Sequence, residues 1–356
     1  MARGVLNKAK KKKTDEFYTQ LPDIEKEVKN YKSKFKEKVV FCNCDDPEYS
    51  NFYYYFVSNF DELGLKKLIT THFEIDKVSY MLEYEGGADV QGDKKTVVKR
   101  AIRHGEKKPL KQNHEQEGQG KLFETEPERS YSGDFRSPEC IELLKKSDIV
   151  VTNPPFSLFR EYVEYLMKYK KKFLIIGDLN ALAYKDIFKY IINNKIWLGV
   201  DNGGEKWFQV PSHYEIQTQS RIKIENGIKY FSKGNIAWFT NLDHYKRHEK
   251  LILYKKYSVD DYPSYDNYDA IEVSTFKDIP MDYDGVMGVP ITFIDKHNPE
   301  QFEIIGQTGV IEPTGLCLEY KSGRPYINGK RMYTRIFIKN KTLAKGARKW
   351  KLNCTK

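Results

Sequence analysis

The chain has 356 residues, of which 40% are hydrophobic, enough to bury the core of one large domain with a smaller region attached. No apolar run approaches the about 20 residues that cross a bilayer, and the basic N-terminus lacks the apolar stretch of a secretory signal. The five cysteines are odd in number and scattered, so we expect a reduced, cytoplasmic protein and no membrane partner.

The net charge of +10 is concentrated at the two ends of the chain. Residues 1–13 contain six Lys or Arg and no acidic residue, and residues 313–356 contain twelve against one. Segregated positive charge suits a polyanionic partner, because the release of counterions from phosphates drives association. Solvated basic tails would give the same pattern, so charge alone leaves nucleic-acid binding open.

Between residues 34 and 242, apolar runs of strand length alternate with amphipathic stretches of helix length. The alternation predicts the α/β class, with a mostly parallel sheet and helices on both faces. The expected strands are 38–42, 68–73, 78–84, 148–152, 172–177, 196–200 and 235–239. The expected helices are 49–62, 138–146, 158–170 and 181–194.

Other segments depart from this alternation and define the expected domains. Residues 1–33 are expected to form a basic N-terminal arm, followed by a catalytic domain at 34–242. The polar, charged stretch 85–128 is expected to be a surface insertion in that domain. Beyond 243 the periodicity weakens and Tyr, Pro and Gly rise, so 243–356 is expected to be a mixed or β-rich region.

The strongest chemical signal is Asn153-Pro154-Pro155-Phe156, directly after the expected strand 148–152. In a parallel sheet, ligands bind outside the carboxyl ends of the strands. Two consecutive prolines fix φ and stiffen the turn, so its polar groups are held in place. Asn-Pro and Pro-Pro also occur in simple turns, but the position after a buried strand favours a functional loop.

The same four residues suit alkylation of an exocyclic aromatic amine. The nitrogen lone pair of such an amine is delocalised into the ring, which makes it a poor nucleophile. The Asn153 side-chain oxygen and the Pro154 carbonyl can accept both amine hydrogens and so favour a pyramidal, reactive nitrogen. Pro155 has no N–H to compete, and Phe156 can stack on the base and face the positive charge that develops.

The turn matches [DNS]-P-P-[FYW], the catalytic pattern of amino-group methyltransferases. Together with Phe41–Pro47 (FCNCDDP), it resembles the EcoRI-type adenine-specific DNA modification methyltransferases. The likeness runs from about Lys13 to about Gly306 and is strongest in 13–75 and 131–200. The resemblance implies a Rossmann-like, S-adenosylmethionine-dependent methyltransferase sheet with a final β-hairpin. It also implies methylation of the N6 amino group of adenine at specific sites in DNA.

The resemblance assigns cofactor-binding residues near the N-terminus. The segment that contains Thr14 and Tyr18 resembles the one that precedes the first strand in this class and closes over the methionine moiety. Cys44, Asp45 and Asp46 lie in the loop after the first strand, where one of the two carboxylates would hold the ammonium group. The glycine-rich F-x-G-x-G of many methyltransferases is missing from this loop. The loop does resemble that of the EcoRI-type methyltransferases.

Three further carboxylates are candidates to bind the ribose and the adenine of the cofactor. Glu74 ends the second expected strand, and its two oxygens suit the vicinal diol of a ribose, with Asp76 as the alternative. Gly133-Asp134-Phe135 resembles the G-D-F motif of such methyltransferases, which implies that Asp134 accepts from the adenine amine of the cofactor and that Phe135 packs on its ring. The resemblance also puts Asn153 beside the cofactor.

The expected macromolecular partner is double-stranded DNA, from which the target adenine must flip out to reach the cofactor. Sequence recognition is expected in 201–234 and 243–356. A cognate restriction endonuclease would be a functional rather than a physical partner, and a monomer would suit an enzyme that modifies one strand per visit. The candidate contacts to phosphates and groove edges are Lys321, Arg324, Lys330, Arg331 and Arg335.

Other residues are weaker candidates. His244 and His248 could share a helix face, but no third ligand is evident, so no metal site is expected. Trp207 and Tyr214 are either core residues or contacts to the flipped base.

Three alternative functions use the same residues. RNA adenine methyltransferases and protein glutamine methyltransferases share the N-P-P-[FY] pattern, although the basic tails disfavour a protein substrate. A catalytically inactive DNA-binding protein on a methyltransferase scaffold is the third, and the intact Asn153, Asp134 and Glu74 argue against it.

Overall fold

The structure, a computed structural model, describes residues 17–44, 50–72, 80–88, 94–97, 134–210, 221–311, 316 and 323–343. The chain divides into two compact units, Met1–Ile176 with Glu205–Gly234 and Gly177–Gly204 with Asn235–Lys356. This division differs from the boundary expected at 242/243. Residues 177–204 group with the C-terminal region because α8 (Lys185–Ile192) packs against β15 (Phe302–Gln307).

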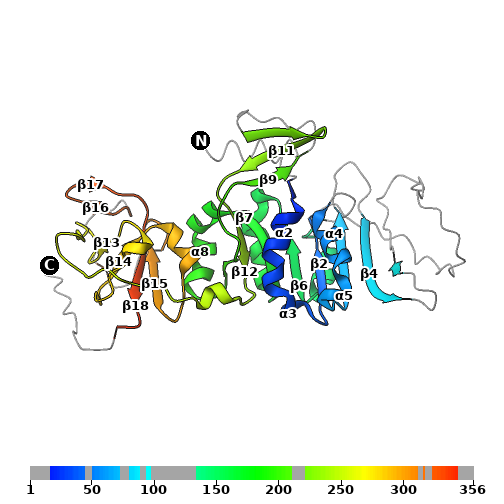
Figure 1. The fold of residues 1–356 in the computed structure, drawn as a ribbon, viewed down its shortest axis with the longest axis horizontal. Coiled ribbons are helices and arrows are strands. Elements are labelled where there is room, and N and C mark those ends of the chain that lie inside the picture. The colour runs from blue at the N-terminus through cyan, green and yellow to red at the C-terminus, as the bar shows by residue number, and fades with distance from the viewer. Residues whose placement is uncertain are drawn as a thin grey trace, which may run out of the picture. The chain divides into compact units, whose positions relative to one another are not determined.

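The main sheet of the first unit has the strand order β5-β4-β3-β2-β6-β7, of which Figure 1 labels β4, β2, β6 and β7. The pairs β2/β3, β2/β6 and β6/β7 are parallel, whereas β4 and β5 add antiparallel to β3. The mixed α/β class is therefore as expected, but part of the expected insertion 85–128 is strand. The strands are β2 (Val39–Cys42), β3 (Lys67–His72), β4 (Tyr80–Ala88), β5 (Lys94–Val97), β6 (Ile149–Thr152) and β7 (Lys172–Asp178).

The helices of this unit follow from local capping and apolar spacing. In α6, the Ser137 hydroxyl accepts from the Cys140 amide and Pro138 occupies the first turn. The expected helix at 49–62 is instead two helices, separated at Asn59. The helices are α2 (Leu21–Val28), α3 (Lys32–Phe35), α4 (Asn51–Ser58), α5 (Phe60–Leu63), α6 (Pro138–Lys146) and α7 (Phe159–Lys168). None of the described helices is long and apolar enough to span a membrane.

A second, four-stranded sheet in the first unit has the order β1-β9-β11-β10 and lies apart from the main sheet (Figure 1). All of its neighbouring strands are antiparallel. Asn226 and Gly227 have positive φ at the turn between β10 and β11, which suits a tight hairpin. The strands are β1 (Tyr18–Thr19), β9 (Lys206–Gln209), β10 (Ile222–Glu225) and β11 (Ile228–Lys233). This sheet was not predicted, and residues 211–220 lie outside the described part.

Beyond α8, the described part of the second unit is rich in strands. Strand β8 (Trp197–Leu198) pairs antiparallel with β12 (Ile236–Thr240). A further sheet has the order β13-β14-β18-β15, and β16 and β17 form a separate hairpin. The remaining strands are β13 (Ile271–Glu272), β14 (Met287–Val289), β16 (Tyr326–Ile327), β17 (Lys330–Arg331) and β18 (Ile336–Asn340).

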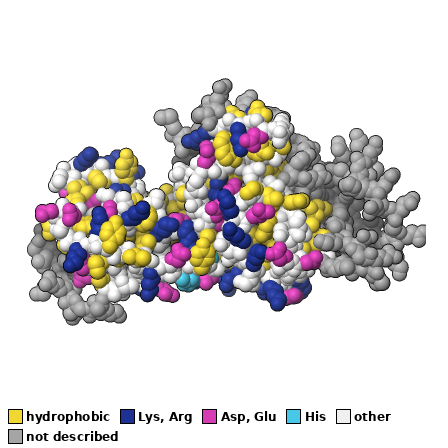
Figure 2. All heavy atoms as spheres, viewed as in Figure 1, with side chains coloured by type: hydrophobic (Ala, Val, Ile, Leu, Met, Phe, Trp, Pro, Cys, Tyr) yellow, Lys and Arg dark blue, Asp and Glu magenta, His cyan; other side chains and the backbone are white. Residues whose placement is uncertain are grey.

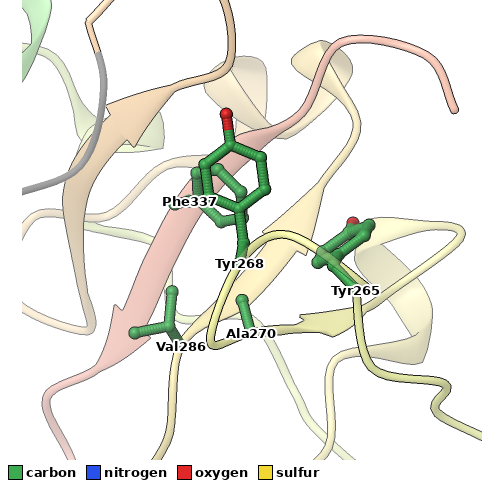
Figure 3. Packing of buried hydrophobic residues seen from close by; sticks show 5 residues of the cluster. All are labelled: Tyr265, Tyr268, Ala270, Val286 and Phe337. Carbon is green, nitrogen blue, oxygen red and sulfur yellow. The ribbon is translucent and has the colours of Figure 1, made fainter. Parts of the chain in front are cut away.

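The core of this C-terminal sheet is an aromatic cluster (Figure 3). Tyr268 packs on Phe337 with ring centroids 4.8 Å apart, and Tyr265 meets Phe337 edge-on at 6.0 Å. Ala270 and Val286 complete the cluster. A Cβ on Gly288 would overlap the Tyr265 ring, so only glycine allows this approach.

The same region contains a buried ion pair between Arg335 and Glu272, although the sequence predicted Arg335 to be a DNA contact. Arg335 is only 8% exposed, and its Nη2 lies 2.6 Å from a carboxylate oxygen of Glu272, which is 5% exposed. The Tyr265 hydroxyl donates to the other oxygen, and burial and the Glu272 charge raise the pKa of Tyr265 well above its ordinary value. Arg335 is therefore a structural residue here and not the surface DNA contact that the sequence predicted.

We expect Arg335→Met to lower the free energy of unfolding by about 3–5 kcal/mol, because Glu272 would remain buried without its partner. Urea denaturation measures the change. The matched control is Lys145→Met, which removes an ion pair that the structure places at the surface, with Glu142. We expect this control to leave the midpoint unchanged. Equal effects of the two substitutions would contradict the structural role of Arg335.

Candidate active site

The loops that follow β2 and β6 meet at the carboxyl edge of the parallel strands. The Thr152 hydroxyl, at the end of β6, donates to the carbonyl of Asn43, directly after β2. The Tyr162 hydroxyl on α7 donates to the Asn43 side-chain oxygen. Cys44 has a φ of 67°, so this loop uses the left-handed region without a glycine. These bonds fix the two loops against each other at the edge where ligands bind in such sheets.

The turn after β6 presents one unsatisfied acceptor. Asn153 is 7% exposed, and its Nδ2 donates to the carbonyl of Phe17 at 2.5 Å. Its Oδ1 is buried and has no hydrogen-bond partner in the described part of the protein. Buried polar atoms are almost always paired, so an unpaired one calls for an explanation such as a ligand. Downstream, the Leu158 amide donates to the Pro155 carbonyl at 2.9 Å, and α7 follows.

Phe156 lies in an aromatic cluster with residues from the second sheet. It stacks on Phe17 with centroids 5.4 Å apart and meets Phe208 of β9 edge-on at 6.3 Å. The Lys233 ammonium, at the end of β11, lies 3.9 Å from the centroid of the Phe156 ring. Phe156 is partly exposed, so its ring can also contact an incoming ligand.

Asp134 and Phe135 lie in the turn just before α6. Asp134 accepts from the Arg136 guanidinium at 2.6 Å and from the Arg136 amide at 2.9 Å. Burial would raise the pKa of the Asp134 carboxyl, but these hydrogen bonds outweigh burial and lower that pKa, which keeps the group an ionised acceptor. Phe135 is buried and meets Tyr162 edge-on at 5.1 Å. Because Tyr162 also bonds Asn43, the Asp134-Phe135 turn is tied to the loop after β2.

Several predicted site residues lie outside the described residues, namely Thr14, Asp45, Asp46, Glu74, Asp76, Tyr214 and Lys321. Tyr18 is described and pairs with Gln209 in the second sheet. Trp207, also in that sheet, has the Lys223 ammonium 4.9 Å from its ring centroid.

The predicted basic contacts fall into different environments in the second unit. Lys330 and Arg331 are exposed on the β16–β17 hairpin. Arg324 is partly buried, and its Nη1 donates to the Thr334 hydroxyl at 2.8 Å. Among the four of these residues that the structure describes, Arg335 alone is buried.

No group of three or more potential metal ligands occurs among the described residues. His244 contacts the Leu198 carbonyl through Nε2 at 2.9 Å, and His248 contacts Asp243 at 2.8 Å. Cys42 is buried.

Sequence reasoning missed three residues of this site: Phe17, Phe208 and Lys233. Phe17 belonged to a segment that the resemblance had assigned to the cofactor, but its contact with Asn153 joins residues 136 positions apart. Phe208 and Lys233 reach the turn through the second sheet. The Asn226-Gly227 pair was the available signal for the hairpin in that sheet.

Comparisons with known proteins agree with the geometry. The profile of the family "Adenine-specific methyltransferase EcoRI" matches residues 5–341. The chain is 49% identical to "Type II methyltransferase M.EcoRI" of Escherichia coli, over 96% of this chain and 98% of that one. It is 36% identical to "Type II methyltransferase M.MpnI" of Mycoplasma pneumoniae, over 94% of this chain and 98% of that one. A third similar protein is "Type II methyltransferase M.MgeORF184P" of Mycoplasma genitalium, at 36% identity over 95% and 99%.

No solved structure matches the chain significantly. The family match covers nearly the whole chain and includes the Asn153–Phe156 turn. The chain therefore belongs to the EcoRI family of adenine-specific methyltransferases.

Proposed function

We propose that this enzyme transfers a methyl group from S-adenosylmethionine to the N6 amino group of a flipped-out adenine at a specific site in duplex DNA. The observation that carries the proposal is the buried, unpartnered Oδ1 of Asn153. An amino hydrogen of adenine would satisfy this acceptor, and the Pro154 carbonyl would take the second hydrogen. The relatives named above are Type II methyltransferases, which supports the choice of DNA.

In this proposal the chain orients the amine and the cofactor supplies the electrophile. S-Adenosylmethionine brings a methyl group already activated on a sulfonium. Asn153 and Pro154 draw the N6 hydrogens away from the plane of the base and expose its lone pair. Phe156 stacks on the flipped adenine, and its ring faces the positive charge that develops on N6. The turn is rigid because two prolines fix its φ angles, so little reorganisation is needed.

The described part of the proposed cofactor site suits such a ligand. Asp134 is an ionised, partly buried acceptor beside the apolar ring of Phe135, which fits an adenine amine and its ring. Cys44 and Tyr18 would border the methionine moiety, while Thr14, Glu74 and one of Asp45 and Asp46 would complete the site. We infer that the sheet around this site is the Rossmann-like sheet of methyltransferases.

DNA contacts would come from exposed basic residues in both units. On the face shown in Figure 2, Lys and Arg are interspersed with Asp and Glu over the described residues. In the sequence, most of the basic surplus lies at the two ends of the chain. We assign Lys330 and Arg331 to phosphates or groove edges, with Arg324 and Lys321 as further candidates. We also assign Lys233, whose ammonium lies 3.9 Å from the centroid of the Phe156 ring, to a phosphate that flanks the target base.

The test of the proposal is transfer of labelled methyl from S-adenosylmethionine to unmodified duplex DNA, with RNA and protein as controls. We expect N6-methyladenine in DNA alone. Label in RNA would support the proposed methyl transfer but contradict DNA as the substrate. Cofactor binding with no label in any substrate would favour the inactive scaffold. A cognate endonuclease would cut the same DNA sequence that this enzyme protects.

We expect Asn153→Ala to lower turnover by about 100-fold or more, because one of the two preorganised acceptors for N6 is lost. Binding of S-adenosylmethionine should change little, and equilibrium binding with single-turnover kinetics separates the two quantities. Equal losses of cofactor affinity and turnover would contradict the assigned role.

We expect Lys330→Ala and Arg331→Ala each to reduce the slope of log affinity against log salt by about 1, if each contacts one phosphate. DNA binding titrated over a range of salt concentrations measures the slope. Lys189→Ala, an exposed lysine on α8 of the same unit, is the control and should leave the slope unchanged. A slope that is unaltered in the two hairpin variants would exclude this hairpin from the interface.

A further inference from the structure

The amide of Asn153 has two ends of nearly equal shape and opposite chemistry. The oxygen accepts hydrogen bonds, and the nitrogen only donates them. Acceptance of an adenine amino hydrogen requires the oxygen to face the substrate. A 180° flip of the amide would present two N–H groups and repel the amine. The site therefore needs something that fixes the orientation of this side chain.

The Phe17 carbonyl supplies that constraint. A backbone carbonyl can only accept, so the atom of Asn153 that faces it at 2.5 Å must be Nδ2. The Oδ1 is then directed away from Phe17 and is the buried atom without a partner. The flip would leave the Phe17 carbonyl facing an oxygen in a buried place, which is unfavourable.

Phe17 itself is held from several sides. The residues that follow it form β1, in which Tyr18 and Thr19 pair with Gln209 and Phe208. The Thr19 carbonyl also accepts from the side chain of Asn51 on α4, at 2.7 Å. The Phe17 ring is 8% exposed and stacks on Phe231 of β11, with centroids 6.0 Å apart. The carbonyl is thus anchored both to the second sheet and to a helix of the main α/β layer.

The ring of Phe17 contacts the other end of the catalytic turn. It stacks on Phe156 at 5.4 Å and an interplanar angle of 29°. Phe17 therefore contacts both Asn153, which is proposed to accept from the adenine, and Phe156, which is proposed to stack on it. Neither contact involves the reacting atoms directly.

We propose that Phe17 is a positioning residue of this methyltransferase. Its carbonyl sets the Asn153 amide with the oxygen toward N6, and its ring supports Phe156 for stacking on the base. This inference rests on the proposed function of Asn153. It also explains why asparagine suits the first position of the turn in this chain, although the family pattern admits aspartate: a carboxylate would oppose the Phe17 carbonyl.

Asn153→Asp tests the role of the carbonyl. At neutral pH we expect turnover to fall by about 100-fold, because the carboxylate has acceptors but no donor for Phe17. A protonated carboxyl has one O–H donor and one carbonyl acceptor, the same pattern as the amide. Turnover relative to the parent enzyme should therefore recover as pH falls through the pKa of the introduced group.

The pH range of that recovery depends on the surroundings. Burial and the Phe17 carbonyl raise the pKa of the introduced carboxyl above the ordinary value of about 3.9. Lys233, whose ammonium lies 5.7 Å from the Phe17 ring centroid, acts in the opposite direction. Turnover relative to the parent enzyme is measured from about pH 8 down to about pH 5, a range chosen to include the raised pKa of the introduced carboxyl. No recovery by the lower limit would overturn the role of the carbonyl.

Phe17→Leu tests the role of the ring. We expect kcat to fall by about 10-fold through misplacement of Phe156, with KM for DNA changed less. The matched control is Phe60→Leu on α5, which also removes a buried ring, there in edge-on contact with Tyr84 at 4.8 Å. It should lower thermal stability by a similar amount and leave kcat unchanged. An unchanged kcat in Phe17→Leu would overturn the role of the ring.

The outcomes separate this inference from the proposed function. Full activity of Asn153→Ala would contradict the proposed function itself. Loss of activity in Asn153→Ala, together with full activity of Asn153→Asp at every pH, would keep the proposed function and refute the positioning role of the Phe17 carbonyl.

Discussion

The hydrogen bond from the Asn153 amide to the Phe17 carbonyl organises this site, because it leaves the amide oxygen buried and unpaired. A buried acceptor without a partner costs about 1–3 kcal/mol. The surrounding structure must offset that cost. Strand β6 does so in part, since all four of its residues are buried between parallel neighbours. The stable strand thus holds a turn that is unfavourable in the absence of a ligand, a common arrangement at functional sites.

A second set of contacts connects the turn to the loops around it. Thr152 bonds the Asn43 carbonyl, Tyr162 bonds the Asn43 side chain, and Phe135 packs on Tyr162. These contacts join the ends of β2 and β6, helix α7 and the segment just before α6. The sheet determines where the loops start, and these buried side chains determine their spacing. Residues assigned to the cofactor and to the base are therefore parts of one connected structure.

Local patterns predicted much of this structure. Apolar runs located β2, β3, β6 and β7, and the Ser137-Pro138 pair located the start of α6, because those signals act over a few residues. The chemistry proposed for Asn153 and Phe156 also rests on their residue types and their position after a strand. The partners of these residues could not be predicted in the same way. The position of Phe17 beside Asn153 depends in part on the pairing of β1 with β9, which joins residues about 190 positions apart, as in Tyr18 with Gln209.

Which basic residues are available to bind DNA also could not be predicted from the sequence. Composition indicates how many Lys and Arg the C-terminal region contains, but not which of them neutralise a buried carboxylate. Arg335 is bound to Glu272 inside the protein, whereas Lys330 and Arg331, only a few residues earlier, are exposed on a hairpin. Lys233, in a segment with no marked basic excess, lies over the Phe156 ring. Affinity for a polyanion depends on charges that can reach phosphates, so exposure and position decide the interface, and net charge only sets an upper limit on it.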